Sequence, residues 1–109
     1  MKAVTFQALH QPLAFEEVPD PTPGEGELVV EVGRCGICGS DLHMTEDAAY
    51  GCKHGDILGH EFAGEVVALG KATQGHKVGD LVSVIPLKSC GKCEHCRKGA
   101  VQWCEQFGL

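Results

Sequence analysis

The stretch GRCGICGSDLH, residues 33–43, follows the apolar run LVVEV and turns the chain out of a strand. Alternating β-branched side chains predict that strand over residues 28–34. The closely spaced glycines after it permit a tightly turned backbone, and Ser40 or Asp41 is expected to cap a short helical turn. The stretch therefore predicts that thiol, hydroxyl, carboxylate and imidazole groups are presented together at the end of a strand.

Short strands separated by turns extend from this stretch in both directions. Four further strands are predicted, over residues 2–7, 13–18, 61–69 and 81–87. Prolines and glycines break the chain between positions 19 and 27, and residues 46–58 are predicted to form a loop. No helical pattern exceeds about ten residues. The fold class is therefore predicted to be mainly β, as a partly open barrel.

The length and charge of the chain limit its function classes. Its 109 residues allow one domain with a modest core. The formal net charge is −6 at pH 7 and the basic residues are scattered, so neither nucleic acid nor an anionic membrane is an expected partner. No apolar run is long enough for a signal-peptide core or a bilayer span, so a cytoplasmic location is expected.

Four of the seven cysteines are crowded into the segment CGKCEHCRKGAVQWC, residues 90–104. In a chain without export signals this crowding favours a metal site over disulfides. The segment is too short for an apolar core, and four thiolates suit a closed tetrahedral zinc site, whose metal would supply the folding free energy. Residues 88–109 are therefore predicted to form a zinc-binding lobe. The expected ligands of its structural zinc are Cys90, Cys93, Cys96 and Cys104.

An iron–sulfur cluster is the main alternative for this lobe. The first three cysteines fit the opening of a bacterial ferredoxin motif, but that motif places its last cysteine after about three residues and before a proline. Here seven residues separate Cys96 from Cys104, and Glu105 follows. The spacing favours zinc. His95, inside the lobe, is interpreted as an exposed bystander, and the same interpretation applies to His10, His54 and His76.

A second group of metal-ligand types lies around the opening stretch. Cys38 is followed about twenty residues later by His60 and Glu61. Thiolate, imidazole and carboxylate are all zinc ligands. Each of these residues also has a simpler interpretation, because Cys35 and Cys38 could form a CxxC redox pair, and a single cysteine is often only a packed thiol.

The sequence as a whole resembles the medium-chain zinc-dependent alcohol dehydrogenases. The resemblance rests on GRCGICGSDLH, GHEFAGEVVALG, the KVGD run from Lys77 and the four cysteines, which occur here in the same order. It covers essentially the whole chain and implies a GroES-like catalytic domain that carries the zinc-binding lobe. Gly39 follows Cys38, and a glycine at this position makes the sequence similar to the sorbitol, butanediol and threonine dehydrogenase branches of the family.

The resemblance also implies which residues hold the two metals. Cys38 and His60 match ligands of the family's catalytic zinc, and Glu61 matches a carboxylate that either binds this metal or lies immediately behind it. Asp41 matches an acid that orients His60. Cys35 matches no functional role and is assigned to packing. The structural zinc is matched by Cys90, Cys93, Cys96 and Cys104.

Two further residues match the family's proton chemistry. Ser40 matches the hydroxyl that contacts the substrate alcohol, and His43 matches the imidazole that passes the proton towards solvent. The chemistry is sensible by itself, since a catalytic zinc keeps an open position and favours ionisation of a bound hydroxyl. Residues three apart on a helical turn can face the same way, and the pKa of histidine suits a relay.

The implied activity is the oxidation of a small alcohol or polyol to a carbonyl, with hydride transfer to NAD(P). A full member has a further ligand for the catalytic zinc and a dinucleotide-binding domain, and no GxGxxG turn occurs in this chain. Residues 1–109 are therefore predicted to be the N-terminal catalytic part of a truncated dehydrogenase. This part is expected to be inactive alone and to hold its catalytic zinc loosely or not at all.

Other functions remain as alternatives. A stand-alone zinc-binding structural domain is the first of them, and a GroES-like co-chaperonin has little support because fold does not carry function. The oligomeric state is open, although an exposed truncated edge is expected to favour a homo-oligomer.

Overall fold

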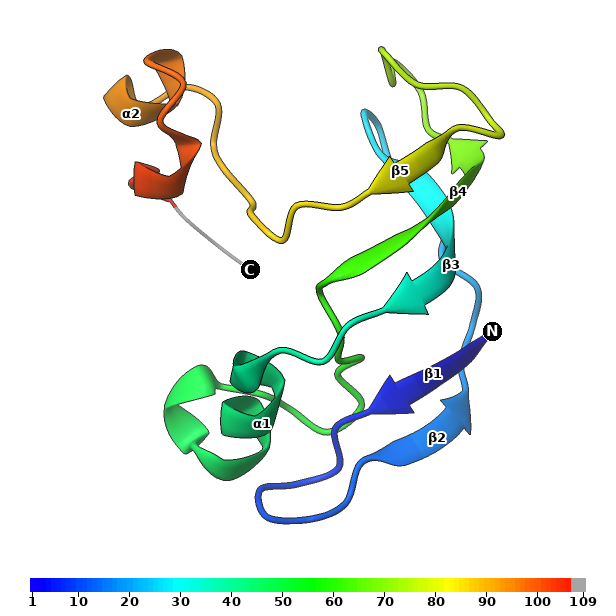
Figure 1. The fold of residues 1–109 in the computed structure, drawn as a ribbon, viewed down its shortest axis with the longest axis vertical. Coiled ribbons are helices and arrows are strands. Elements are labelled where there is room, and N and C mark those ends of the chain that lie inside the picture. Colours follow the sequence, from blue (N-terminus) through cyan, green and yellow to red (C-terminus); the bar gives the residue numbers. More distant parts are fainter. Residues whose placement is uncertain (107–109) are drawn as a thin grey trace.

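Two antiparallel sheets carry the fold of residues 1–106, the part of the chain that the computed structural model describes (Figure 1). The first sheet pairs β1 with β2, and the second has the order β3–β4–β5. The strands are β1 (Lys2–Thr5), β2 (Ala14–Glu17), β3 (Leu28–Cys35), β4 (Phe62–Leu69) and β5 (Leu81–Ser83). The mainly β prediction is confirmed, and the two sheets do not close into a barrel.

Four short helical elements lie between and after the strands. They are α1 (Gly39–Glu46), the 3-10 turn η1 (Ala48–Tyr50), α2 (Glu94–Arg97) and the 3-10 turn η2 (Val101–Trp103). The predicted loop 46–58 therefore contains a helical turn. The Asp47 carboxylate accepts a hydrogen bond from the Ala49 N–H at 2.8 Å, which stabilises the start of η1. The last three residues of the predicted lobe, 107–109, lie outside the described residues.

The start of α1 and the end of β5 both differ from the sequence-based expectations. The N-cap of α1 is Cys38, so Ser40 and Asp41 lie inside the helix. Asp41 still serves the cap, because its Oδ2 accepts a hydrogen bond from the Cys38 N–H at 2.9 Å. The strand predicted over 81–87 ends at Ser83, and a proline at position 86 has no N–H to continue the ladder.

A bulge bends β3 just before the chain turns towards α1. The register between β3 and β4 shifts between Val32 and Arg34, which leaves Gly33 without a partner in β4. The two strands approach closely at Gly64, where a Cβ atom would lie only 2.0 Å from the carbonyl oxygen of Glu31. Glycine at position 64 therefore permits the pairing that directs the end of β3 towards the site.

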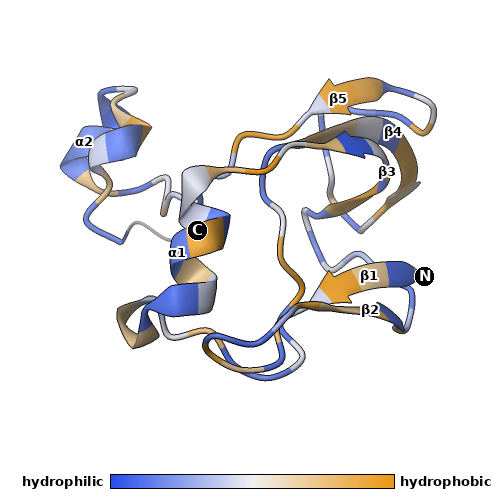
Figure 2. Cartoon of the chain, turned by 60° about the horizontal axis from the view of Figure 1, so that its bottom comes forward, coloured by the Kyte–Doolittle hydropathy of each residue, from blue (hydrophilic) through white to orange (hydrophobic). Residues whose placement is uncertain are grey.

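Little of the described chain is buried. Its buried residues are Ala3, Thr5, Phe6, Val66 and Cys104. The accessible surface is 7941 Å², whereas a compact monomer of this mass would expose about 5,800 Å² by the usual scaling. Apolar residues are visible along β1 and β5 in Figure 2, and the Leu81 side chain is 83% exposed. The strands therefore present apolar surface that nothing within residues 1–106 covers.

Candidate metal centres

The four cysteines of the lobe converge on one point. Their sulfur atoms all lie within 4.8 Å of one another, and the Sγ atoms of Cys90 and Cys96 are 4.0 Å apart. Tetrahedral zinc with Zn–S bonds of about 2.3 Å requires sulfur atoms about 3.8 Å apart. All seven cysteines of the chain are free thiols. The donor set and its spacing therefore fit a tetrahedral zinc.

Backbone N–H groups point at these sulfur atoms and favour the charged form of two of them. Cys93 N donates to Cys90 Sγ at 3.3 Å, and Cys96 N donates to Cys93 Sγ at 3.4 Å. The hydrogen bond from Cys96 N, with further backbone donors, lowers the pKa of Cys93 to about 6. Backbone donors, Lys92 N first, also lower the pKa of Cys90. Burial, followed by the side-chain contact with Cys93, raises the pKa of Cys96 to about 12. Without metal, the backbone thus favours the thiolate, the form that binds metal, at Cys90 and Cys93 and not at Cys96.

The second centre brings together Cys38, His60 and Glu61, named here the Cys38 centre. One ligand atom from each residue lies within 4.8 Å of the others. Cys38 comes from the N-cap of α1, and the other two residues come from the segment just before β4. Gly59 precedes them with φ of 106°, and a Cβ atom there would lie 2.9 Å from Cys35 Sγ. A glycine at this position therefore lets the segment before β4 pass close to the Cys35 side chain.

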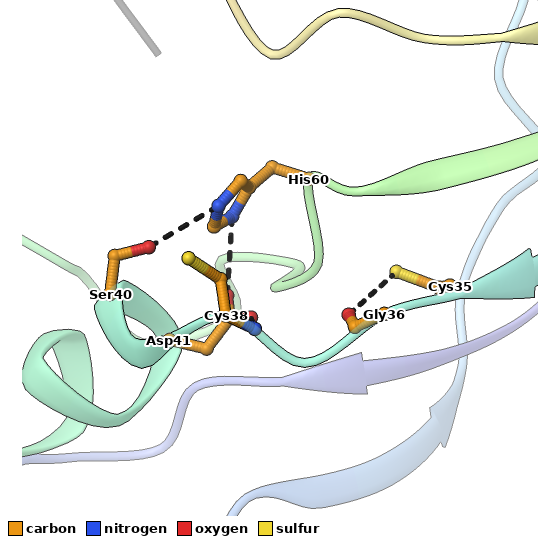
Figure 3. A network of polar contacts seen from close by, with 6 residues as sticks. All are labelled: Cys35, Gly36, Cys38, Ser40, Asp41 and His60. Carbon is orange, nitrogen blue, oxygen red and sulfur yellow. Dashed lines mark hydrogen bonds and ion pairs between the residues drawn. The ribbon is translucent and has the colours of Figure 1, made fainter.

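Asp41 lies between Cys38 and His60 and contacts both residues (Figure 3). Its Oδ1 lies 3.3 Å from His60 Nδ1, and its Oδ2 accepts the hydrogen bond from Cys38 N. The Asp41 side chain is only 13% exposed. The Oδ1–Nδ1 contact is a close charge contact and not a hydrogen bond, since Oδ1 is buried with no hydrogen-bond partner among the described residues. With the carboxylate beside Nδ1, Nε2 is the ring nitrogen left for a metal, and Ser40 Oγ lies 3.2 Å from it. A thiolate, an imidazole fixed by a carboxylate, and a carboxylate form a donor set that fits zinc.

The proposed relay residue His43 lies on the same helix but contacts a different partner. Its ring stacks on Tyr50 with a centroid distance of 6.3 Å and an interplanar angle of 9°. No hydrogen bond joins Ser40 to His43 among residues 1–106, so the relay stays a prediction. Sequence reasoning missed Tyr50, because it lies beyond the end of α1 in η1, where helical spacing gives no signal.

Cys35 is separate from the Cys38 centre. Figure 3 shows its side chain at the end of β3 beside Gly36, apart from Cys38, Ser40 and His60. The Cys35 thiol donates to Gly36 O at 3.4 Å. A hollow of about 510 Å³ lies nearby and is lined by residues that include Cys35 and Glu61, but not by Ser40 or His43.

Comparison with known proteins gives the same family from sequence and from structure. The family model described as the alcohol dehydrogenase GroES-like domain matches residues 24–109. An L-threonine 3-dehydrogenase of Saccharopolyspora erythraea is 45% identical over 107 residues, which are 95% of this chain and 31% of that protein. A sorbitol dehydrogenase of Halalkalibacterium halodurans is 42% identical over 92 residues, 84% of this chain and 26% of that protein.

A solved structure agrees with these relatives. A short chain alcohol dehydrogenase from E. coli CFT073, complexed with NADH, superposes with a TM-score of 0.85 and 36% identity, and covers 100% of this chain and 31% of that one. The chain thus spans about 30% of the length of the proteins it matches. No helix of the described residues is long and apolar enough to cross a membrane.

Proposed function

Because this chain belongs to the alcohol dehydrogenase GroES-like domain family, we propose that it is the catalytic-domain part of a zinc-dependent oxidoreductase. The reaction would oxidise a small secondary alcohol, polyol or amino alcohol to a carbonyl, with hydride transfer to NAD(P). The names of the threonine and sorbitol dehydrogenases support this substrate class. The single observation that carries the proposal is the convergence of Cys38, His60 and Glu61 within 4.8 Å.

The Cys38 centre would hold the catalytic zinc, and the four-cysteine lobe would hold a structural one. When bound, the catalytic zinc supplies a Lewis acid that polarises an alcohol oxygen. Asp41 keeps the His60 ring in one orientation by its contact to Nδ1. This contact favours the tautomer in which Nε2 is free to bind metal.

Ser40 and His43 would handle the proton of the substrate. The Ser40 hydroxyl lies beside the metal-binding face of His60, so an alcohol bound there could pass its proton to Ser40. His43 is the nearest histidine along α1 that could accept the proton and release it to solvent. Tyr50 would hold the His43 ring by stacking.

The nicotinamide cofactor would be bound by polypeptide other than residues 1–109, because these residues contain no glycine-rich phosphate turn. The large exposed surface supports the presence of such further polypeptide, as in a longer dehydrogenase. We expect residues 1–109 alone to be inactive as a dehydrogenase.

Elemental analysis of protein purified without added zinc tests this proposal. We expect about one tightly bound zinc per chain, in the lobe, and a weaker site at the Cys38 centre because its shell lacks a strong ligand. Cys38→Ser should remove only the weak site. Two tightly bound zincs would favour the stand-alone zinc-binding domain, and iron with visible absorbance would overturn the assignment of the lobe.

A further inference from the structure

We infer that the N-terminal hairpin, residues 1–18, is a positioning element for the Cys38 centre, a role that rests on the function proposed above. The hairpin contributes no ligand and lies outside residues 24–109, which the family model matches. It nevertheless contacts both of the segments that supply the ligands. These segments are α1 with its N-cap, and the loop 54–60 that leads to His60.

The hairpin holds the loop through its backbone. An isolated antiparallel bridge joins Thr5 to Ile57, so the loop extends the first sheet by a short stretch. Three hydrogen bonds accompany the bridge: Phe6 N donates to Asp56 O (2.8 Å), Gly55 N to Phe6 O (2.9 Å) and Leu58 N to Val4 O (3.1 Å). Leu58 is two positions before His60. His60 therefore follows closely, along the chain, the residue by which the loop is hydrogen-bonded to the hairpin.

The turn of the hairpin holds α1 at its opposite end. His10 N donates to Thr45 O at 2.9 Å, in the last turn of the helix. His10 has a positive φ of 60°, an unusual conformation for a residue other than glycine. Cys38 is the N-cap of the same helix, which also carries Asp41. A displacement at Thr45 would therefore be passed along the helix to the thiolate ligand.

The hairpin is well suited to this role because it is among the best buried parts of an open molecule. Thr5 is 1% exposed, Phe6 3% and Ala3 7%. Three of the five buried residues of the described chain thus lie in the hairpin, and two of them, Thr5 and Phe6, lie where it meets the loop. Because metal ligands must be held to within about 0.5 Å of their working geometry, a firm support beneath both segments matters for the centre.

His10→Pro tests this inference and His10→Gly is its matched control. Proline removes the N–H that donates to Thr45 O and cannot adopt a positive φ, whereas glycine keeps both the donor and the conformation. Zinc alone is titrated against a chromophoric chelator, with Cys38→Ser to identify the weak site. His10→Pro should weaken that site by about tenfold, the effect typical of losing a supporting partner. His10→Gly, and the four-cysteine lobe in both variants, should be unchanged.

Phe6→Leu is a milder second variant that keeps every backbone bond and most of the buried volume. It should weaken the same site in the same direction by a smaller factor. An unchanged Cys38 centre in both Phe6→Leu and His10→Pro would overturn the inference. A parallel loss of both metal sites would also overturn it, because the hairpin would then support the whole fold.

Amide hydrogen exchange without metal separates this inference from the proposed function. His10→Pro should speed exchange in α1 and the loop 54–60, relative to His10→Gly, and leave α2 unchanged. If the wild-type chain binds no second zinc, the proposed function fails, but faster exchange in these two segments would still support the positioning role. Unchanged exchange in both segments would overturn it.

Discussion

The four-cysteine lobe and the Cys38 centre differ in how much of the chain is needed to assemble them. In the lobe all four sulfur atoms come from residues 90–104, and the N–H donors to the sulfurs include residues of the same segment. In the Cys38 centre the thiol and the imidazole are 22 positions apart, on segments joined through Asp41 and the hairpin. Closing a longer loop costs more entropy. A metal can therefore assemble the lobe locally, whereas the Cys38 centre takes its geometry from the tertiary fold.

Cys96→Ser should produce the largest effect, because it removes a soft ligand from the local site. We expect the zinc affinity of the lobe to fall by more than about 100-fold. Loss of a residue that only supports a metal ligand costs at most about this factor, and loss of a ligand itself should cost more. The Cys38 centre should keep its weaker affinity. Elemental analysis after dialysis, with His95→Ala as the control within the same helix, measures the change. Loss of both sites together would mean that the two centres are not independent.

Asp41→Asn should produce an intermediate effect and only at the Cys38 centre. The amide removes the negative charge that holds His60 Nδ1, so the zinc affinity of this centre should fall by about 10- to 100-fold. Chelator competition measures it. Asp47→Asn, which changes an acid that caps η1 and contacts neither ligand, is the matched control. Equal losses in the two variants would show that Asp41 acts only through general charge.

The smallest effect is expected outside both centres, at the turn that precedes β5. Lys77 Nζ donates to Asp80 Oδ1 at 2.5 Å, and this bond, followed by the one from the Lys77 backbone N–H, lowers the pKa of Asp80. A lowered folded-state pKa stabilises the fold above the usual value of 3.8, and this contribution is lost as the pH falls below it.

Thermal unfolding of wild type and Asp80→Asn over a range of pH checks this sign. Asp80→Asn should lower Tm slightly at pH 7, and the difference should shrink towards zero as the pH falls below the usual aspartate value of 3.8. Neither metal content should change. A difference that grows towards low pH would contradict the expected direction.

Much of the fold was accessible from the sequence because its signals are local. β-branched runs and glycine turns placed all five strands, with errors at their ends, and the strand over 81–87 was too long because a proline at 86 cannot continue the ladder. The helix start was wrong by two or three residues. Its N-cap is Cys38, and the cap depends on a reciprocal contact with Asp41 that spacing alone does not reveal.

The spacing of thiols within one short segment was enough to predict the four-cysteine lobe, because ligands that are close in sequence can reach one metal without help from the rest of the fold. For the Cys38 centre, the sequence supplied the ligand types and a family resemblance. Only the tertiary structure brought them within 4.8 Å, placed Asp41 behind His60 and set the hairpin under both segments. Backbone hydrogen bonds such as the one from His10 to Thr45 carry no side-chain signature, so no sequence pattern could have predicted them.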